Sequence, residues 1–304
     1  MKVNTVLGPV DVDELGFTLT HEHLHNDQFP VYTSDRNARM YDIEMMVEEV
    51  QLYADAGGST MFEVTPPDLG RNPAGIAEVS RRTGVHILMS TGRYREEFYE
   101  AELWKRPAAD IATEFTAEIE EGVDGIRAAL IAEIGVNGYH VTPIEERIHR
   151  AAARAHNATG VPISTHSPCS EVGLGQLDIF EEEGVDLRRV VVGHCDTWPF
   201  IEYHEAIAAR GAFVQYDVIR GIFPAEVKRQ ARLVVEMISR GHIEQLLISQ
   251  DINREISLVG YGGTGYAYII TTFSDMLREA GVTDEQLRTI SVDNPRRLLT
   301  GEAA

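Results

Sequence analysis

The sequence predicts an α/β protein, a single (β/α)8 TIM barrel that spans residues 1–304 as one domain. Short apolar runs rich in β-branched residues recur along the chain, and most are followed by a longer segment with helical spacing. Several of these runs, such as Val190-Val191-Val192, are continuously apolar. That pattern is typical of a parallel sheet that is covered on both faces.

Eight segments have the strand pattern. We expect strands at residues 16–20, 60–64, 85–90, 128–133, 161–166, 190–194, 212–217 and 246–251. Helical patterns between them include residues 43–56, 143–159, 200–210 and 225–240, which are followed by the glycines expected at helix ends, Gly57, Gly160, Gly211 and Gly241. The alternative, a doubly wound open sheet, usually has a glycine-rich phosphate turn after its first strand. Here histidines follow that strand, and eight units favour a closed barrel.

Composition excludes several classes of partner. A formal charge of −21 would repel nucleic acid, since such binding depends on Lys and Arg contacts to phosphate. No apolar run approaches the roughly 20 residues that span a bilayer, and no signal peptide is evident, which predicts a cytoplasmic protein without a membrane partner. Cys169 and Cys195 are too few for a disulfide framework. A small-molecule substrate is the expected partner, and a homodimer is left open.

Side chains that can bind a metal end five of the predicted strands. Residues two apart on a strand project from the same face, so both imidazoles of the His-X-His pair can meet one ion. Any one such residue could be a chance polar side chain at a strand end, but that explanation is poor for all of them together. Four imidazoles and two carboxylates suit zinc, manganese, iron or cobalt and suffice for two ions. The set is His21, His23, Glu133, His166, His194 and Asp251.

Several motifs together resemble the phosphotriesterase-like branch of the amidohydrolase superfamily, which includes phosphotriesterase homology proteins and lactonases. The resemblance covers nearly the whole chain. Its motifs are Thr5-Val6-Leu7-Gly8, Thr18-Leu19-Thr20-His21-Glu22-His23-Leu24, Glu133-Ile134-Gly135, Pro162-Ile163-Ser164-Thr165-His166, Gly193-His194, Tyr261-Gly262-Gly263-Thr264-Gly265-Tyr266 and Asn294-Pro295-Arg296-Arg297-Leu298-Leu299.

The resemblance implies a binuclear centre with two divalent ions, zinc first, with Mn²⁺, Co²⁺ or Fe²⁺ as alternatives. In the family's pattern His21, His23 and Asp251 hold the buried ion, and His166 and His194 hold the exposed one. Glu133 bridges them. The best-known phosphotriesterases use a carbamylated lysine as bridge, but the lysines of this chain, Lys2, Lys105 and Lys228, are far from any predicted strand end. Organophosphates are therefore not expected as main substrates.

The family's chemistry implies that metal-activated hydroxide attacks a lactone or carboxylic ester, while Asp251 transfers the proton to the leaving group. Phosphotriesters would be promiscuous substrates. Three alternatives remain open: an N-acyl amide hydrolase on the same site, a non-catalytic metal-stabilised binding protein, and a single-metal deaminase.

Other residues have weaker assignments. In the family's lactonases a tyrosine near the position of Tyr94 approaches the substrate oxygen, so we count Tyr94 as catalytic and substrate-binding. Arg254 could bind a substrate carboxylate or phosphate, or could be a surface ion-pair partner. His149, His156 and His204 lie in helical segments and are expected to face solvent.

Overall fold

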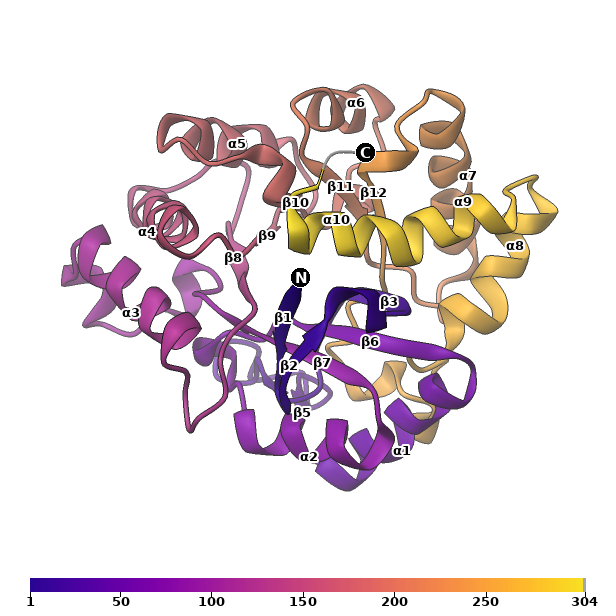
Figure 1. The fold of residues 1–304 in the computed structure, drawn as a ribbon, viewed down its shortest axis with the longest axis horizontal. Helices are drawn as coiled ribbons and strands as arrows, with labels where there is room; N and C mark the ends of the chain where they lie inside the picture. Colours follow the sequence, from indigo (N-terminus) through magenta and orange to yellow (C-terminus); the bar gives the residue numbers. More distant parts are fainter. Residues whose placement is uncertain (303–304) are drawn as a thin grey trace.

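The computed structural model describes residues 1–302, and its centre is an eight-stranded parallel sheet rolled almost into a closed barrel (Figure 1). Neighbouring strands follow chain order. They are β3 (Phe17–Glu22), β6 (Gly58–Glu63), β7 (His86–Thr91), β8 (Leu130–Gly135), β9 (Ile163–His166), β10 (Val190–Val192), β11 (Phe213–Tyr216) and β12 (Leu246–Ile248). The predicted barrel and its strands are confirmed, and only the strand ends differ.

Helices surround the sheet on its outer side (Figure 1). They are α1 (Ile43–Asp55), α2 (Pro73–Thr83), α3 (Ala108–Glu120), α4 (Pro143–Thr159), α5 (Val172–Glu182), α6 (Ile201–Ala209), α7 (Pro224–Ser239), α8 (Ser274–Glu279) and α9 (Asp284–Arg288). A further helix, α10 (Asn294–Thr300), lies across one end of the barrel. The four predicted helices are confirmed. For α4 the local causes are plain, because Thr142 and Glu145 form a capping box at its start and Gly160, with φ 75°, ends it.

One end of the barrel is closed by packed apolar side chains. The hairpin β1 (Lys2–Thr5) and β2 (Gly8–Asp11) and helix α10 lie across the middle of the ring of helices (Figure 1). Their residues form one buried cluster with inward-facing residues of the strands: Val3, Val12, Leu298 and Leu299 with Phe62, Leu88, Leu130, Val191, Phe213 and Leu247. The polar residues at the carboxyl ends of the strands therefore lie at the opposite end, where barrels of this type build their sites.

The first and last strands are joined mainly through side chains. The amide of Asp251 donates to the carbonyl of His21 over 3.1 Å. The buried carboxylate of Glu22 accepts from the amides of Gln250 and Ile252 at 2.8 and 3.0 Å, and from Ser249 Oγ at 2.7 Å. Glu22 thus closes the barrel from a position between His21 and His23.

Two predicted strands, 190–194 and 246–251, end two or three residues earlier than expected, and the last residue predicted for each leaves the extended conformation. His194 has φ 57° and Asp251 has φ 48°, in the left-handed region that non-glycine residues rarely adopt. Both residues were predicted as metal ligands. Strain of this kind concentrates at functional sites, where the surrounding structure holds it in place.

The expectation that three helical histidines face solvent is wrong. His149, His156 and His204 are buried. A ring nitrogen of each lies within hydrogen-bond distance of a main-chain carbonyl, at 2.7 Å from Glu145, 2.7 Å from Val161 and 2.8 Å from Cys195. These carbonyls can accept the single N–H of a neutral imidazole inside the core. Among residues 1–302, no helix combines the length and apolarity needed to cross a bilayer.

Candidate metal centre

The other five predicted ligands gather around one buried carboxylate, that of Glu133 near the end of β8. Its Oε1 lies 2.6 Å from His166 Nδ1, 2.9 Å from His194 Nε2 and 3.3 Å from His21 Nε2. His166 Nδ1 and His194 Nε2 are themselves 2.7 Å apart. Side chains from four strand ends therefore meet within one small volume, which the residue types alone could only suggest.

His23 lies near the other oxygen of the same carboxylate, and Asp251 lies beside His23. His23 Nε2 lies 3.2 Å from Asp251 Oδ1 and 3.8 Å from Glu133 Oε2. His21 Nε2 lies 3.9 Å from Asp251 Oδ1. The six residues thus form two groups of nitrogen and oxygen atoms that share Glu133: His21, His23 and Asp251 on one side, His166 and His194 on the other.

The opposite ring nitrogens of three histidines face oxygen atoms. Asp217 lies 2.7 Å from Nδ1 of His194 and 3.2 Å from Nδ1 of His21. His23 Nδ1 lies 2.8 Å from Thr65 Oγ1, whose hydroxyl donates to Glu63. Metal-binding histidines usually donate their second N–H in this way, which leaves the first nitrogen free to bind an ion.

Asp217 is absent from our sequence-based set. A signal for it existed, because it ends the predicted strand at 212–217 just as the other ligands end theirs. The predicted strand at 212–217 contains no histidine, so no second ligand type marked Asp217 as part of the site. Its carboxylate also accepts from the main-chain N–H of His194 at 3.1 Å, so it positions both the backbone and the ring of that residue.

The site is built to hold positive charge. Burial opposes ionisation of Glu133, yet His166 and His21 hold the pKa of Glu133 well below its usual range. Burial likewise opposes ionisation of Asp217, whose pKa His194 and His21 lower. Burial would also lower the pKa of His21, but Asp217 and Glu133 raise it to about 10. These carboxylates remain ionised only with cations beside them.

Divalent metal ions fit this arrangement. His21 Nε2 is buried without a hydrogen-bond partner among the described residues, although it faces two carboxylates. Within residues 1–302, three clusters have ligand atoms close enough for one ion: His21, His23 and Glu133; His21, His194 and Asp217; and Glu133, His166 and His194. Imidazole nitrogens and carboxylate oxygens are the ligands that zinc and related metals take in catalytic sites.

Asp251 is held firmly on its outer side. Arg220 Nη2 donates to Asp251 Oδ2 at 2.5 Å, and Asn253 Nδ2 lies 3.0 Å from Oδ1. Burial opposes ionisation of this carboxyl, but Arg220 keeps the pKa of Asp251 below its ordinary value. Oδ1 also faces His23, so this carboxylate lies between a candidate ligand nitrogen and the cavity outside.

A cavity of about 340 Å³ opens above these groups. Tyr94 lines it, with its hydroxyl 3.3 Å from His166 Nε2. Burial keeps the pKa of Tyr94 well above its usual value, so the phenol stays neutral and can donate a hydrogen bond. The cavity is lined by Gln28, Tyr32, Tyr94, Arg95, His166, Pro168, His194, Thr197, Val218, Arg220, Asp251, Asn253 and Arg254.

Arg254 also lines this cavity, and it has partners at the same time. Its Nε donates to Asp35 at 2.9 Å and its Nη1 to Gln28 at 2.7 Å. The two alternatives weighed for it, a group beside the substrate and an ion-pair partner, are therefore both compatible with its position.

Two glycines allow the strands to carry these residues so close together. A Cβ on Gly135, two residues after Glu133, would lie 2.3 Å from the carbonyl oxygen of Tyr94. A Cβ on Gly193 would lie 2.2 Å from the carbonyl oxygen of Thr165. Any larger residue would push the Tyr94 loop away from β8, or separate His194 from His166.

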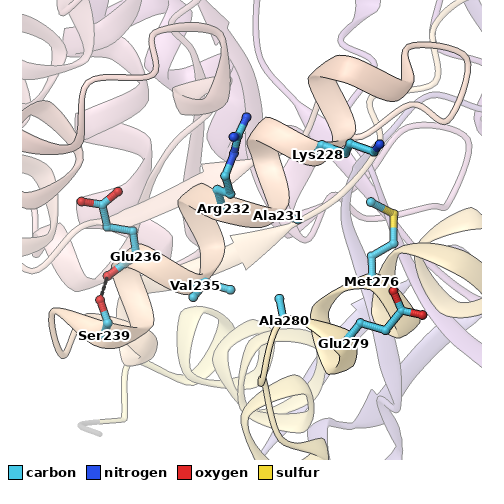
Figure 2. A pocket seen from close by; sticks show the side chains of 9 residues that line it. All are labelled: Lys228, Ala231, Arg232, Val235, Glu236, Ser239, Met276, Glu279 and Ala280. Carbon is cyan, nitrogen blue, oxygen red and sulfur yellow. Dashed lines mark hydrogen bonds between the residues drawn. The ribbon is translucent and has the colours of Figure 1, made fainter.

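A larger hollow lies elsewhere on the molecule. The groove between α7 and α8 has a volume of about 700 Å³ and is lined by Val235 and Met276 among charged side chains (Figure 2). None of its lining residues is a histidine or cysteine. Chemistry rather than size therefore identifies the candidate site.

Known proteins resemble this chain over nearly its whole length. A model of the phosphotriesterase family matches residues 1–299. A phosphotriesterase homology protein from Escherichia coli is 37% identical over 287 residues, covering 93% of this chain and 97% of the relative. The crystal structure of the Escherichia coli phosphotriesterase homology protein, complexed with phosphate in the active site, aligns with a TM-score of 0.91 at 35% identity, over 95% of this chain and 100% of that one.

Two more distant proteins have named activities. A lactonase from Listeria monocytogenes aligns with a TM-score of 0.92 at 27% identity, over 100% of both chains. An N-acetyltaurine hydrolase from Danio rerio is 27% identical over 343 residues, with 98% of each chain covered. Both proteins are hydrolases of acyl compounds, one named for lactones and the other for an amide.

Proposed function

This chain belongs to the phosphotriesterase family, and from that premise we propose that it is a binuclear metal-dependent hydrolase of lactones or carboxylic esters. The observation that carries the proposal is the convergence of four imidazoles on Glu133, with Asp251 beside two of them. We assign one ion to His21, His23 and Asp251, the second to His166 and His194, and the bridge to Glu133. Zinc is the first candidate, with manganese, cobalt and iron as alternatives.

Two bound ions would supply a water of lowered pKa as nucleophile and would polarise the substrate carbonyl. Residues of the chain would transfer the proton and bind the substrate oxygen. Asp251 is ionised and faces the site, so it accepts the proton of the attacking water and passes it to the leaving group. His166 Nε2–H donates to the Tyr94 oxygen in our assignment, which leaves the Tyr94 hydroxyl free to donate to a substrate oxygen.

Lactones and carboxylic esters rank first as substrates, because the chain aligns with a lactonase over its whole length. N-acyl amides are the second candidate, since N-acetyltaurine hydrolases are also relatives. Phosphotriesters would be promiscuous substrates. A binding protein without turnover and a single-metal deaminase explain less, because neither accounts for six converging ligands and a shared carboxylate.

Elemental analysis combined with a hydrolysis screen tests the proposal. We expect close to two metal ions per chain and hydrolysis of an activated ester or lactone that stops on chelation and returns with zinc, manganese or cobalt. A reproducible content near one ion per chain would contradict the binuclear centre. Full hydrolysis by metal-free protein would contradict the mechanism.

The location, domain count and substrate size of this protein are proposed from its sequence. We place the protein in the cytoplasm as one domain of 304 residues that acts on small molecules. A homodimer stays a prediction, which light scattering of the purified protein can test.

A further inference from the structure

Arg95 is a nearly buried cation in the loop that follows β7. The residue is 9% exposed. Its guanidinium carbon lies 5.1 Å from the ring centre of Tyr94, and 5.6 Å from those of Tyr32 and Phe98. Three aromatic rings therefore hold the guanidinium in place, since their faces attract cations.

This guanidinium has no hydrogen-bond acceptor in the described part of the chain. Its Nε is buried without a partner, and the nearest carboxylate oxygen, Glu97 Oε2, is 3.5 Å from Nη2. Arg71 is a useful contrast, because its buried side chain donates to Glu118 at 2.6 Å and to the carbonyl of Ser90 at 2.7 Å. Buried polar groups are normally paired, so the Arg95 side chain requires an explanation.

The unpaired guanidinium faces the cavity above the candidate metal centre. Arg95 lines this cavity together with His166 and Asp251. A second cation, Arg254, lies 5.6 Å from the same Tyr32 ring. Two guanidinium groups are thus concentrated beside the candidate site of a chain whose net charge is −21. An anion in the cavity would supply the acceptor that Arg95 lacks and would relieve the repulsion between the two arginines.

We propose that Arg95, with Arg254 beside it, binds an anionic group of the substrate, so that this enzyme acts on acyl compounds that carry a carboxylate, sulfonate or phosphate. The planar fork of a guanidinium matches the oxygen atoms of such groups. The inference rests on the proposed function, because it assigns the substrate's charge to the cavity of that same site. Arg95 is then a substrate-binding residue that orients the acyl carbonyl toward the metal centre.

Calorimetry tests the anion site without any turnover. Zinc-loaded protein is titrated with straight-chain dicarboxylates from malonate to adipate and with their monoamides, which keep the length but lose one charge. We expect wild type to bind at least one dicarboxylate about tenfold more tightly than its monoamide, and Arg95→Met to abolish this preference, since hydrogen bonds to charged groups are worth about that much. Arg95→Lys should retain part of it.

Arg93→Met is the matched control. Arg93 lies in the same loop, but Glu114 already binds its guanidinium. This variant should keep the preference for dicarboxylates. If Arg95→Met also keeps it, or if wild type never shows it, the proposed anion site is wrong.

Kinetics with matched esters test the consequence for the substrate. The pair is 4-sulfophenyl acetate, which is anionic, and 4-sulfamoylphenyl acetate, which is neutral and of similar shape. Arg95→Met should lower the ratio of their kcat/KM values about tenfold or more. Equal losses on both esters would mean that Arg95 only shapes the cavity. If metal-loaded wild type hydrolyses neither ester nor any lactone, the proposed function fails, while calorimetry still decides the anion site.

Discussion

At the scale of single residues, Asp251 combines two contacts with different consequences. Its Oδ1 faces His23 Nε2, and its Oδ2 accepts from Arg220. We expect Asp251→Asn to lower turnover about 10²–10⁴-fold, because an amide accepts a proton poorly. Metal content should fall much less, since His21, His23 and Glu133 remain. Turnover and metal content are measured on the same preparation, and turnover near wild type would place the proton acceptor elsewhere.

Glu133 allows a test against the lysine-based bridge of better-known relatives. A bridging lysine must first react with carbon dioxide, whereas glutamate carries its carboxylate already. Apo-protein given metal in bicarbonate-free buffer should regain activity as fast as it does with bicarbonate. A strong bicarbonate requirement would rule out the glutamate bridge.

The variant Glu133→Gln completes this test. A neutral amide cannot offset two dications, so metal and activity should be lost together. Dialysis followed by elemental analysis measures the first loss, and hydrolysis of an activated ester measures the second. A Glu133→Gln protein that keeps two ions and full activity would contradict the assignment.

The candidate ligands could be predicted from the sequence because each lies at or close to the end of a predicted strand, and strand ends follow from local patterns of apolar residues. His21, His166 and Glu133 are examples. Arg95 and Arg220 could not be predicted, because their roles depend on loop paths that no local pattern determines. Asp217 was predicted only in part. Its position at a strand end was predicted, but its contacts were not, because its two imidazole partners come from β3 and from the residue two positions after β10.

At the scale of elements, α4 contains a buried histidine that makes the fold sensitive to acid. Burial lowers the pKa of His149 to about 4 from its ordinary value of 6.5. Between these two values the unfolded chain binds a proton that the native protein does not. Stability therefore falls as pH decreases from 6.5 toward 4, by about 2 kcal/mol at pH 5.

His149→Leu should reduce this loss. Urea unfolding at pH 7.5 and pH 5 gives the change in stability for each protein, and the variant should lose less than wild type. His140→Leu replaces an exposed histidine at the loop before α4 and should behave like wild type. If both variants lose as much stability as wild type, protonation of His149 does not contribute to acid sensitivity.

The helices also show where sequence-based prediction fails at this scale. Helical spacing correctly predicted α4 and α6, but their histidines were placed on the solvent side because histidine is a polar residue. Main-chain carbonyls close to the ring nitrogens of His149 and His204 allow burial instead. The carbonyl beside His149 belongs to the preceding turn of its own helix, whereas the one beside His204 comes from Cys195 in another segment, and neither contact shows which face of the helix is buried.

At the scale of the whole molecule, the candidate ligands connect strands that are distant along the chain. Ions held by His21, Glu133 and Asp251 together would bind the native barrel, because only folding brings these three residues together, and would not bind the unfolded chain in this way. Such binding stabilises by about 4 kcal/mol when free metal exceeds its Kd a thousandfold, which for a chain of this size is a shift in Tm of roughly 6 °C. Calorimetric scans of apo- and metal-loaded protein measure it, and identical Tm values would exclude tight binding to these strands.

The closure of the barrel by Glu22 has a consequence for biosynthesis. The hydrogen bonds between the first and last strands join residues 228 and 230 positions apart, so this joint cannot form until the ribosome has released almost the whole chain. Asp251 lies in the same segment, so the proposed metal centre would gain its last ligand only late in translation. A chain that stops before Ser249 leaves the edge of β3 unpaired and Glu22 without its amides. Because open edges of this kind pair with other chains, we expect truncated products to aggregate rather than to persist as partial barrels.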